Sequence, residues 1–255
     1  MPGALSRKAR NKRSESSLYF HISGEITEAE RTVYITENTA DFNSVDYSES
    51  TVYTGVKNNS LNISTGGDPA YQVRNYGGSV NLTVHKMAVG YHSFGLISFE
   101  GLSNVPVGAV ITSATIGFFV KNKSGDTQII GLNKMLKTWV AGTGDDYQAA
   151  VGDSCGAYQT YNTAAWETVG AAGNTDRSVT WSGYLTPDVW TDNIWLTLTD
   201  GQLLTDVQGM VATPAANYGW RLTRTDGNDD EHYVNFGSVL YTDGYRPYLK
   251  VVGTW

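Results

Sequence analysis

The sequence has little cysteine, little charge and no long hydrophobic run. The single cysteine, Cys155, has no second cysteine in the chain to pair with, so an internal disulfide framework is excluded. Charged residues make up 17% of the 255, below the usual share of about a quarter. No apolar stretch approaches the length that crosses a membrane. We therefore expect a single large core, no contact with a membrane, and Cys155 as a buried, inert thiol.

The sequence also lacks the motifs of common catalytic sites. The four histidines form no i, i+4 pair and no cluster with cysteine at zinc spacing. No Gly-x-Ser-x-Gly motif is present, and the glycine-rich residues 142–144 are not followed by the lysine of a phosphate-binding loop. These absences predict a protein that is not an enzyme and that needs no cofactor.

One weak indication of a metal site remains. Glu37, Asp41 and Asp46 follow an early predicted strand, and hard cations such as calcium take oxygen ligands of this kind. Their spacing matches no known calcium-binding loop. The sequence favours solvated acidic side chains over a structural calcium ion, which stays as the alternative.

Charge is unevenly divided between the N-terminus and the rest of the chain. Residues 1–13 carry +5, which leaves −12 on the remaining 242 of a total of −7. The acidic part argues against nucleic-acid binding through general electrostatics, and we expect no sequence-specific contact with nucleic acid. The arm lacks the hydrophobic stretch of a secretory signal. It suits contact with an acidic partner, with the acidic body of a neighbouring copy or with nucleic acid, and the alternative is a solvated tail. The five cations predicted to bind a partner are Arg7, Lys8, Arg10, Lys12 and Arg13.

Beyond a transition segment that ends at residue 30, the sequence has the period of β-strands. Apolar residues alternate with polar ones in 33–36, 80–85, 114–121, 194–199 and 220–225. This period places one face of each strand on a core. We expect Ile116, Phe118, Leu196, Leu198 and Leu222 to share that core.

Local breaks in the pattern predict bulges, turns and loops. The alternation slips by one in 94–99, which predicts a β-bulge. Thr-Asp-Gly at 199–201, 225–227 and 242–244, and Val-Pro-Val-Gly at 105–108, are typical turn sequences. Residues 203–211 suit a short helix, and 141–178 suit a long loop of the kind that often carries function. The pattern predicts an all-β antiparallel two-sheet sandwich over residues 31–255, preceded by an extended N-terminal arm over residues 1–30.

Several motifs occur in a definite order along the predicted strands. They are an Asn-Tyr-Gly turn at 75–77, a strand ending in Phe at 94–99, Pro-x-Gly-Ala and Ile-Thr-Ser-Ala-Thr within 106–115, Trp139 before an acidic loop, and the closing strands at 217–222 and 245–251. This order resembles the DNRLRE-type domain, a jelly-roll β-sandwich grouped with carbohydrate-binding modules. The DNRLRE string itself is absent. Residues 161–177 resemble the versions found in bacteriophage structural proteins.

The resemblance implies two functions. The first is a virion structural protein that decorates or cements a phage capsid. Its expected partners are the major capsid protein or another virion protein, and the extended arm is long enough to contact a second copy of the chain. The alternative is a stand-alone carbohydrate-binding module for a host or environmental polysaccharide, secreted or placed on a cell surface by a non-classical route.

Sugar recognition needs exposed aromatic rings and polar donors. The alternative is that the aromatic rings are core residues. The residues that we predict to contact a glycan are Trp139, Tyr147, Tyr158, Tyr161, Trp166, Arg74 and Arg221.

Overall fold

The computed structural model describes residues 29–37, 51–64, 66, 68–86, 90–125, 128–186, 191–225 and 231–255. The basic arm with Arg7, Lys8, Arg10, Lys12 and Arg13, and the candidate metal ligands Asp41 and Asp46, lie outside these residues. The elements are β1 (Glu30–Thr36), β2 (Thr51–Thr54), β3 (Val56–Ser64), η3 (Pro69–Val73), β4 (Arg74–Asn75), β5 (Asn81–Lys86), β6 (Tyr91–Phe99), η4 (Glu100–Asn104), β7 (Val110–Lys123), β8 (Ile130–Met135), β9 (Tyr147–Gln148), β10 (Tyr158–Thr160), β11 (Ala164–Ala165), β12 (Arg177–Leu185), β13 (Ile194–Leu198), α1 (Gly201–Ala212), η5 (Pro214–Ala216), β14 (Trp220–Arg224), β15 (His232–Gly237) and β16 (Tyr248–Thr254).

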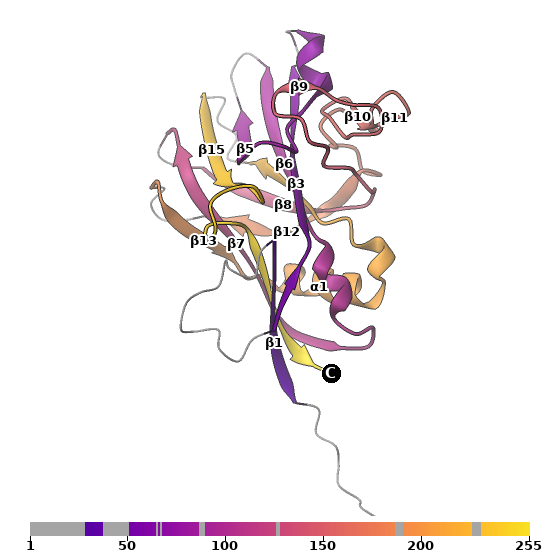
Figure 1. Ribbon diagram of the computed structural model, residues 1–255, viewed down its shortest axis with the longest axis vertical. Helices are drawn as coiled ribbons and strands as arrows, with labels where there is room; N and C mark the ends of the chain where they lie inside the picture. The colour runs from indigo at the N-terminus through magenta and orange to yellow at the C-terminus, as the bar shows by residue number, and fades with distance from the viewer. Residues whose placement is uncertain are drawn as a thin grey trace, which may run out of the picture.

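The fold is all-β, as predicted, but twelve of the strands are linked into one large mixed sheet, and β4–β9 and β10–β11 form two small two-stranded sheets. Its order is β12-β8-β14-β6-β5-β15-β7-β16-β1-β2, with β3 paired to β6 and β13 paired to β7. The pair β1–β2 is parallel. Figure 1 shows β7, β13 and β15 on one side of the molecule and α1 on the other.

The sheet folds over where β5 meets β6, so that its two halves pack face to face like a sandwich. The described β5–β6 pairing consists of His85 with Ser93 and Lys86 with His92. Farther along, the halves approach closely, because a Cβ on Gly95 of β6 would lie 3.1 Å from the Leu82 side chain of β5. The continuous hydrogen bonding between the halves differs from the two separate sheets that the sequence predicted.

The main core lies between these two halves. The five predicted core residues are all buried in it: Ile116, Phe118, Leu196, Leu198 and Leu222. The rings of Phe118 and Phe236 lie 5.1 Å apart within it, and the rings of Phe99 and Trp220 lie 6.3 Å apart. Close packing of large rings of this kind stabilises the fold.

Helix α1 closes one end of the core. Asp200 caps it, because the carboxylate accepts a hydrogen bond of 2.8 Å from the backbone N–H of Gln202. Its buried apolar residues are Leu203, Val207, Met210 and Val211, which share one helical face. The predicted helix is therefore confirmed, whereas the turn predicted at 199–201 is instead the start of the helix. No helix in the described segments is long and apolar enough to span a membrane.

The bulge predicted in 94–99 is wrong. Strand β6 pairs with β3 without a register shift from Tyr91 opposite Ser64 to Phe99 opposite Val56. The apolar pattern slips because Leu96 is buried on the outer side of the sheet, in a second cluster, while Ile97 and Phe99 are in the main core. Since both faces of β6 are covered, its sequence need not alternate.

Candidate functional site

The two tryptophans predicted to bind a glycan are buried, which corrects that prediction. Trp139 and Trp166 are 2% and 5% exposed and pack with Leu61, Leu96 and Met135 in the second cluster. The indole of Trp139 donates to the Tyr218 carbonyl at 2.8 Å, and that of Trp166 donates to the Cys155 carbonyl at 2.9 Å. Neither ring can stack on a sugar, because both faces contact the protein.

Arg221 is also buried, so its predicted contact with an acidic sugar is corrected too. It is 2% exposed, donates from Nε to the Gly170 carbonyl at 2.7 Å, and places its guanidinium 3.8 Å from the centre of the Phe94 ring. Burial, with repulsion from Arg177, lowers the pKa of Arg221 to about 9. Arg221 therefore joins the long loop to the sheet beneath it.

Asp176 holds the turns of the same loop together. Its buried carboxylate accepts hydrogen bonds from the backbone N–H groups of Glu167, Thr168 and Gly173 at 3.0, 3.1 and 3.1 Å, and from Lys137 Nζ at 2.8 Å. Burial alone raises the pKa of Asp176, but these four donors outweigh it and lower the pKa overall. The predicted long loop is thus a fixed cover over the outer face of the sheet.

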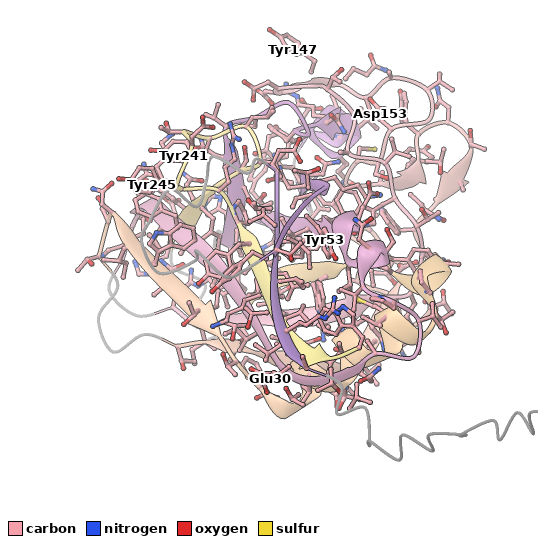
Figure 2. All side chains as sticks on the ribbon, turned by 60° about the horizontal axis from the view of Figure 1, so that its bottom comes forward. Glu30, Tyr53, Tyr147, Asp153, Tyr241 and Tyr245 are labelled. Atoms are coloured by element: carbon pink, nitrogen blue, oxygen red, sulfur yellow. The ribbon has the colours of Figure 1, made fainter. Side chains whose placement is uncertain are left out.

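The predicted tyrosines lie nearer the surface but do not form one platform with the tryptophans. Tyr147 is 71% exposed and projects from the top of the molecule (Figure 2). Tyr158 and Tyr161 are half-buried and pack edge to face, with ring centres 5.4 Å apart. Arg74 forms an ion pair of 2.7 Å with Asp146. These four residues keep access to solvent.

Glu37 is the candidate metal ligand that the structure describes, and its side chain bonds to the backbone. The carboxylate of Glu37 accepts a hydrogen bond of 3.2 Å from the N–H of Val56. Within the described segments no group of three or more His, Cys, Asp or Glu side chains is placed to hold a metal ion. Cys155 is buried as predicted, and burial raises the pKa of its thiol.

A shallow groove with two aromatic side chains lies beside the edge strand β12. Its volume is about 760 Å³, within the range of about 300–1,000 Å³ usual for ligand sites. The rings of Trp181 and Tyr184 have centres 5.4 Å apart, and Tyr184 is 42% exposed. The other described residues that line this aromatic groove are Ile129, Thr186, Leu198, Thr199, Asp200 and Thr225.

A β-bulge in β12 puts both rings on the same face. Trp181 lies opposite Asn133 of β8 and Gly183 lies opposite the next residue, Leu132, so Ser182 is the extra residue. Ser182 points into the interior, where it donates to Asp206 at 2.5 Å and accepts from the Trp220 indole at 3.1 Å. Without the bulge, residues three apart on a strand would point to opposite faces.

Strand β8 supports the Trp181 ring from below. A Cβ on Gly131 would lie 2.5 Å from that ring, so the indole lies directly against the glycine backbone. The guanidinium of Arg177 lies 5.8 Å from the ring centre. This packing holds the indole in one orientation before any ligand arrives, which reduces the entropy lost on binding.

The groove combines flat apolar rings with polar residues. Aromatic rings present apolar area to the C–H face of a sugar ring, and Thr186, Thr199 and Asp200 line the same groove. The alternative role is purely structural, with the ring pair covering the edge of the sheet. An apolar surface with a few polar groups is the usual composition of a ligand site.

Sequence reasoning missed Trp181 and Tyr184. A spacing of three assigns them to opposite faces of a regular strand, so nothing in their pattern links them. The available signal was Gly183 between them, since glycine within a strand often marks a bulge; its φ of 146° lies in the region that glycine tolerates best.

Two comparisons of the sequence with known proteins identify no relative. A scan of the sequence against models of known families finds no match, and a search of curated proteins finds none either. The resemblance to the DNRLRE-type domain therefore stays a prediction from the sequence.

Proposed function

We propose that this protein is a non-catalytic β-sandwich of the jelly-roll kind that binds a polysaccharide in the aromatic groove. The observation that carries the proposal is the pairing of Trp181 and Tyr184 on one face by the bulge in β12. The DNRLRE-type resemblance supports the same class of ligand independently of this geometry.

The shallow shape of the groove favours an internal stretch of a chain over a buried small molecule. Its lining is divided between apolar rings and hydroxyl or carboxylate groups. Such a surface recognises the sugar face by contact area and its hydroxyls by hydrogen bonds. We expect a dissociation constant between about 1 μM and 1 mM, or about −8 to −4 kcal/mol.

Affinity electrophoresis in gels that contain neutral or acidic polysaccharides tests this proposal. We expect at least one polysaccharide to retard the native chain, Trp181→Ala to abolish the retardation and Tyr184→Ala to weaken it. Tyr245→Ala is the matched control, since it removes a ring of similar exposure outside the groove that is not among the predicted glycan contacts. Equal retardation of the native chain and Trp181→Ala would overturn the proposal, as would no retardation by any polysaccharide of the panel.

A second proposal, that the protein decorates a phage capsid, rests on the charge division between residues 1–13 and the rest of the chain. A +5 arm on a −12 body suits an acidic capsid surface, and such contacts weaken as salt rises. The test is co-sedimentation with empty capsids at low and high salt. A full-length variant with all five cations of the arm replaced by glutamine should sediment less than the native chain, and equal sedimentation would contradict this proposal.

A further inference from the structure

A second cleft, separate from the aromatic groove, lies between β3 and β5 where the sheet folds over. Its volume is about 320 Å³, and every described residue that lines it carries a polar group. Ser60 and Asn62 come from β3, Thr83 comes from β5, and the loop acids Asp145 and Asp146 complete its rim. We call it the polar cleft. It shares no described lining residue with the aromatic groove.

Asn62 supplies the observation that points to a ligand. The residue is 5% exposed and lines the polar cleft. Its Oδ1 atom is buried and has no hydrogen-bond partner among the described residues. The side chain also has a hydrogen bond with Tyr76, which leaves Oδ1 as its unpaired atom. Buried side-chain acceptors are nearly always paired, so an unpaired one on a residue that lines a cleft is suited to a donor from outside the protein.

The rim of the cleft is held in place by charge and hydrogen bonds. Asp146 Oδ1 accepts from Arg74 at 2.7 Å and from the Tyr76 hydroxyl at 2.5 Å. The Tyr76 bond, together with Arg74, lowers the pKa of Asp146, whereas burial and the bond to Asp146 raise the pKa of Tyr76. At neutral pH the carboxylate is therefore ionised and the phenol is protonated, which fixes which group donates.

The backbone on both sides of this rim is also tied together. The N–H of Gly78 donates to the Gly144 carbonyl at 2.7 Å, and the side chain of Asn75 donates to the Ala141 carbonyl at 2.6 Å. A Cβ on Gly77 would lie 2.0 Å from the Ala141 carbonyl oxygen, so the two segments are in direct contact. These contacts fix the backbone next to residues 145 and 146 before a ligand binds, and a fixed backbone lowers the entropic cost of binding.

The groups that face the polar cleft specify a ligand rich in hydrogen-bond donors. Asn62 Oδ1 and the Asp145 carboxylate accept hydrogen bonds, and two carboxylates on the rim repel an anionic ligand. A bound metal ion is disfavoured because, although His85 also lines the cleft, no group of three or more His, Cys, Asp or Glu side chains among the described residues is placed to hold one. Neutral sugar hydroxyls can donate to these acceptors. The hydroxyls of Thr83 and Tyr76, which belong to residues of the same lining, already donate to Asn235 and Asp146 and can therefore only accept from a ligand.

We propose that the polar cleft is a second binding site, which takes one neutral sugar unit whose hydroxyls donate to Asn62 Oδ1 and to the Asp145 carboxylate. This site does not require the aromatic groove to bind anything. Where both sites bind, one protein can hold two positions on a polysaccharide, and linked sites bind more tightly than either site alone.

Titration of the full-length, ¹⁵N-labelled chain with glucose, galactose and mannose tests the polar cleft directly. We expect at least one of these sugars to shift the Asn62 side-chain amide and the backbone N–H groups of residues 77–79 in a saturable way. Asp145→Ala should weaken this binding by about tenfold or more, since it removes a hydrogen bond to a charged group. Asp145 is exposed, so the variant should fold.

Three controls separate the possible outcomes. Asn62→Ala should remove the response, and Asp243→Ala, which removes an exposed acid outside the cleft, should keep it. Trp181→Ala should also keep it, so loss of the aromatic groove and loss of the polar cleft are distinguishable. No saturable shift with any of the three sugars would overturn the inference. So would an unchanged response in Asp145→Ala, or shifts at these residues caused by calcium chloride and by none of the sugars.

Discussion

Two pairs of aromatic side chains, Trp139 with Trp166 and Trp181 with Tyr184, lie on the same half of the sheet but have different surroundings. Trp166 belongs to the long loop over 141–178 and Trp139 lies just before it; both indoles are 5% exposed or less. The second pair lies on the edge strand β12 and lines a groove. Whether an aromatic ring is buried or exposed here depends on whether another segment of the chain packs over it. The residue type alone does not specify this.

The largest effect should come from truncating the covered pair. Trp166→Ala removes a buried ring and its bond to the Cys155 carbonyl, so we expect the free energy of unfolding to fall by about 3–5 kcal/mol. Trp139→Ala should have a similar effect. Urea denaturation followed by circular dichroism measures both. A loss below about 1 kcal/mol in either variant would mean that the loop does not pack as a second core.

The next largest effect on stability should come from Asp176, whose carboxylate holds the long loop in place. Asp176→Asn keeps the shape of the side chain but leaves at least one of its four donors without a good acceptor. We expect a loss of about 1–3 kcal/mol. Ser178→Ala, two residues along in β12, is the control and should change little. A loss of the same size in both variants would argue that the strand matters and the carboxylate does not.

Low pH should lower the free energy of unfolding by protonating Asp176, which holds the long loop in place. Because the pKa of Asp176 is lowered in the folded chain, its contribution is present above the unfolded value of about 3.9 and is lost as pH falls through the lower folded value. Unfolding free energies measured between pH 6 and pH 2 should therefore drop less steeply below pH 4 in Asp176→Asn than in the native chain. Parallel curves would contradict this assignment.

A smaller effect is expected where β8 supports the exposed pair. Gly131→Ala places a methyl group where the Trp181 ring now lies, so the ring must move. Since this ring is partly exposed and able to shift, we expect a loss of only about 1 kcal/mol, at the low end for overpacking. Binding to the retarding polysaccharide should nevertheless fall as much as in Trp181→Ala. Normal binding would show that the ring's support by β8 is not needed.

An equally small effect on stability should come from Trp181→Ala itself. The ring packs with Tyr184 at the edge of the sheet, and such pairs contribute about 0.5–1.5 kcal/mol. We expect a loss of about 1 kcal/mol in the same urea assay, several-fold less than for Trp166→Ala. Equal losses for the two tryptophans would remove the contrast between the covered and the exposed pair.

Much of the fold follows from local pattern. Period-two alternation identified the strands that carry Ile116, Phe118 and Leu222, and these residues are buried together. The helix over α1 and the buried position of Cys155 were also predicted correctly. Alternation works for these elements because one face of each meets the core, and that face repeats every two residues in a strand.

The candidate sites, by contrast, depend on contacts between distant segments. The sequence by itself placed aromatic rings in residues 139–166, but only the tertiary structure decided that the loop turns two of them onto the outer face of β6. Only the register of β12 against β8 aligned Trp181 with Tyr184, and only the fold brought Asn62 to Asp145. Side-chain period is a local property of the backbone, whereas burial and proximity depend on which segment packs above, and one segment's own pattern does not encode that.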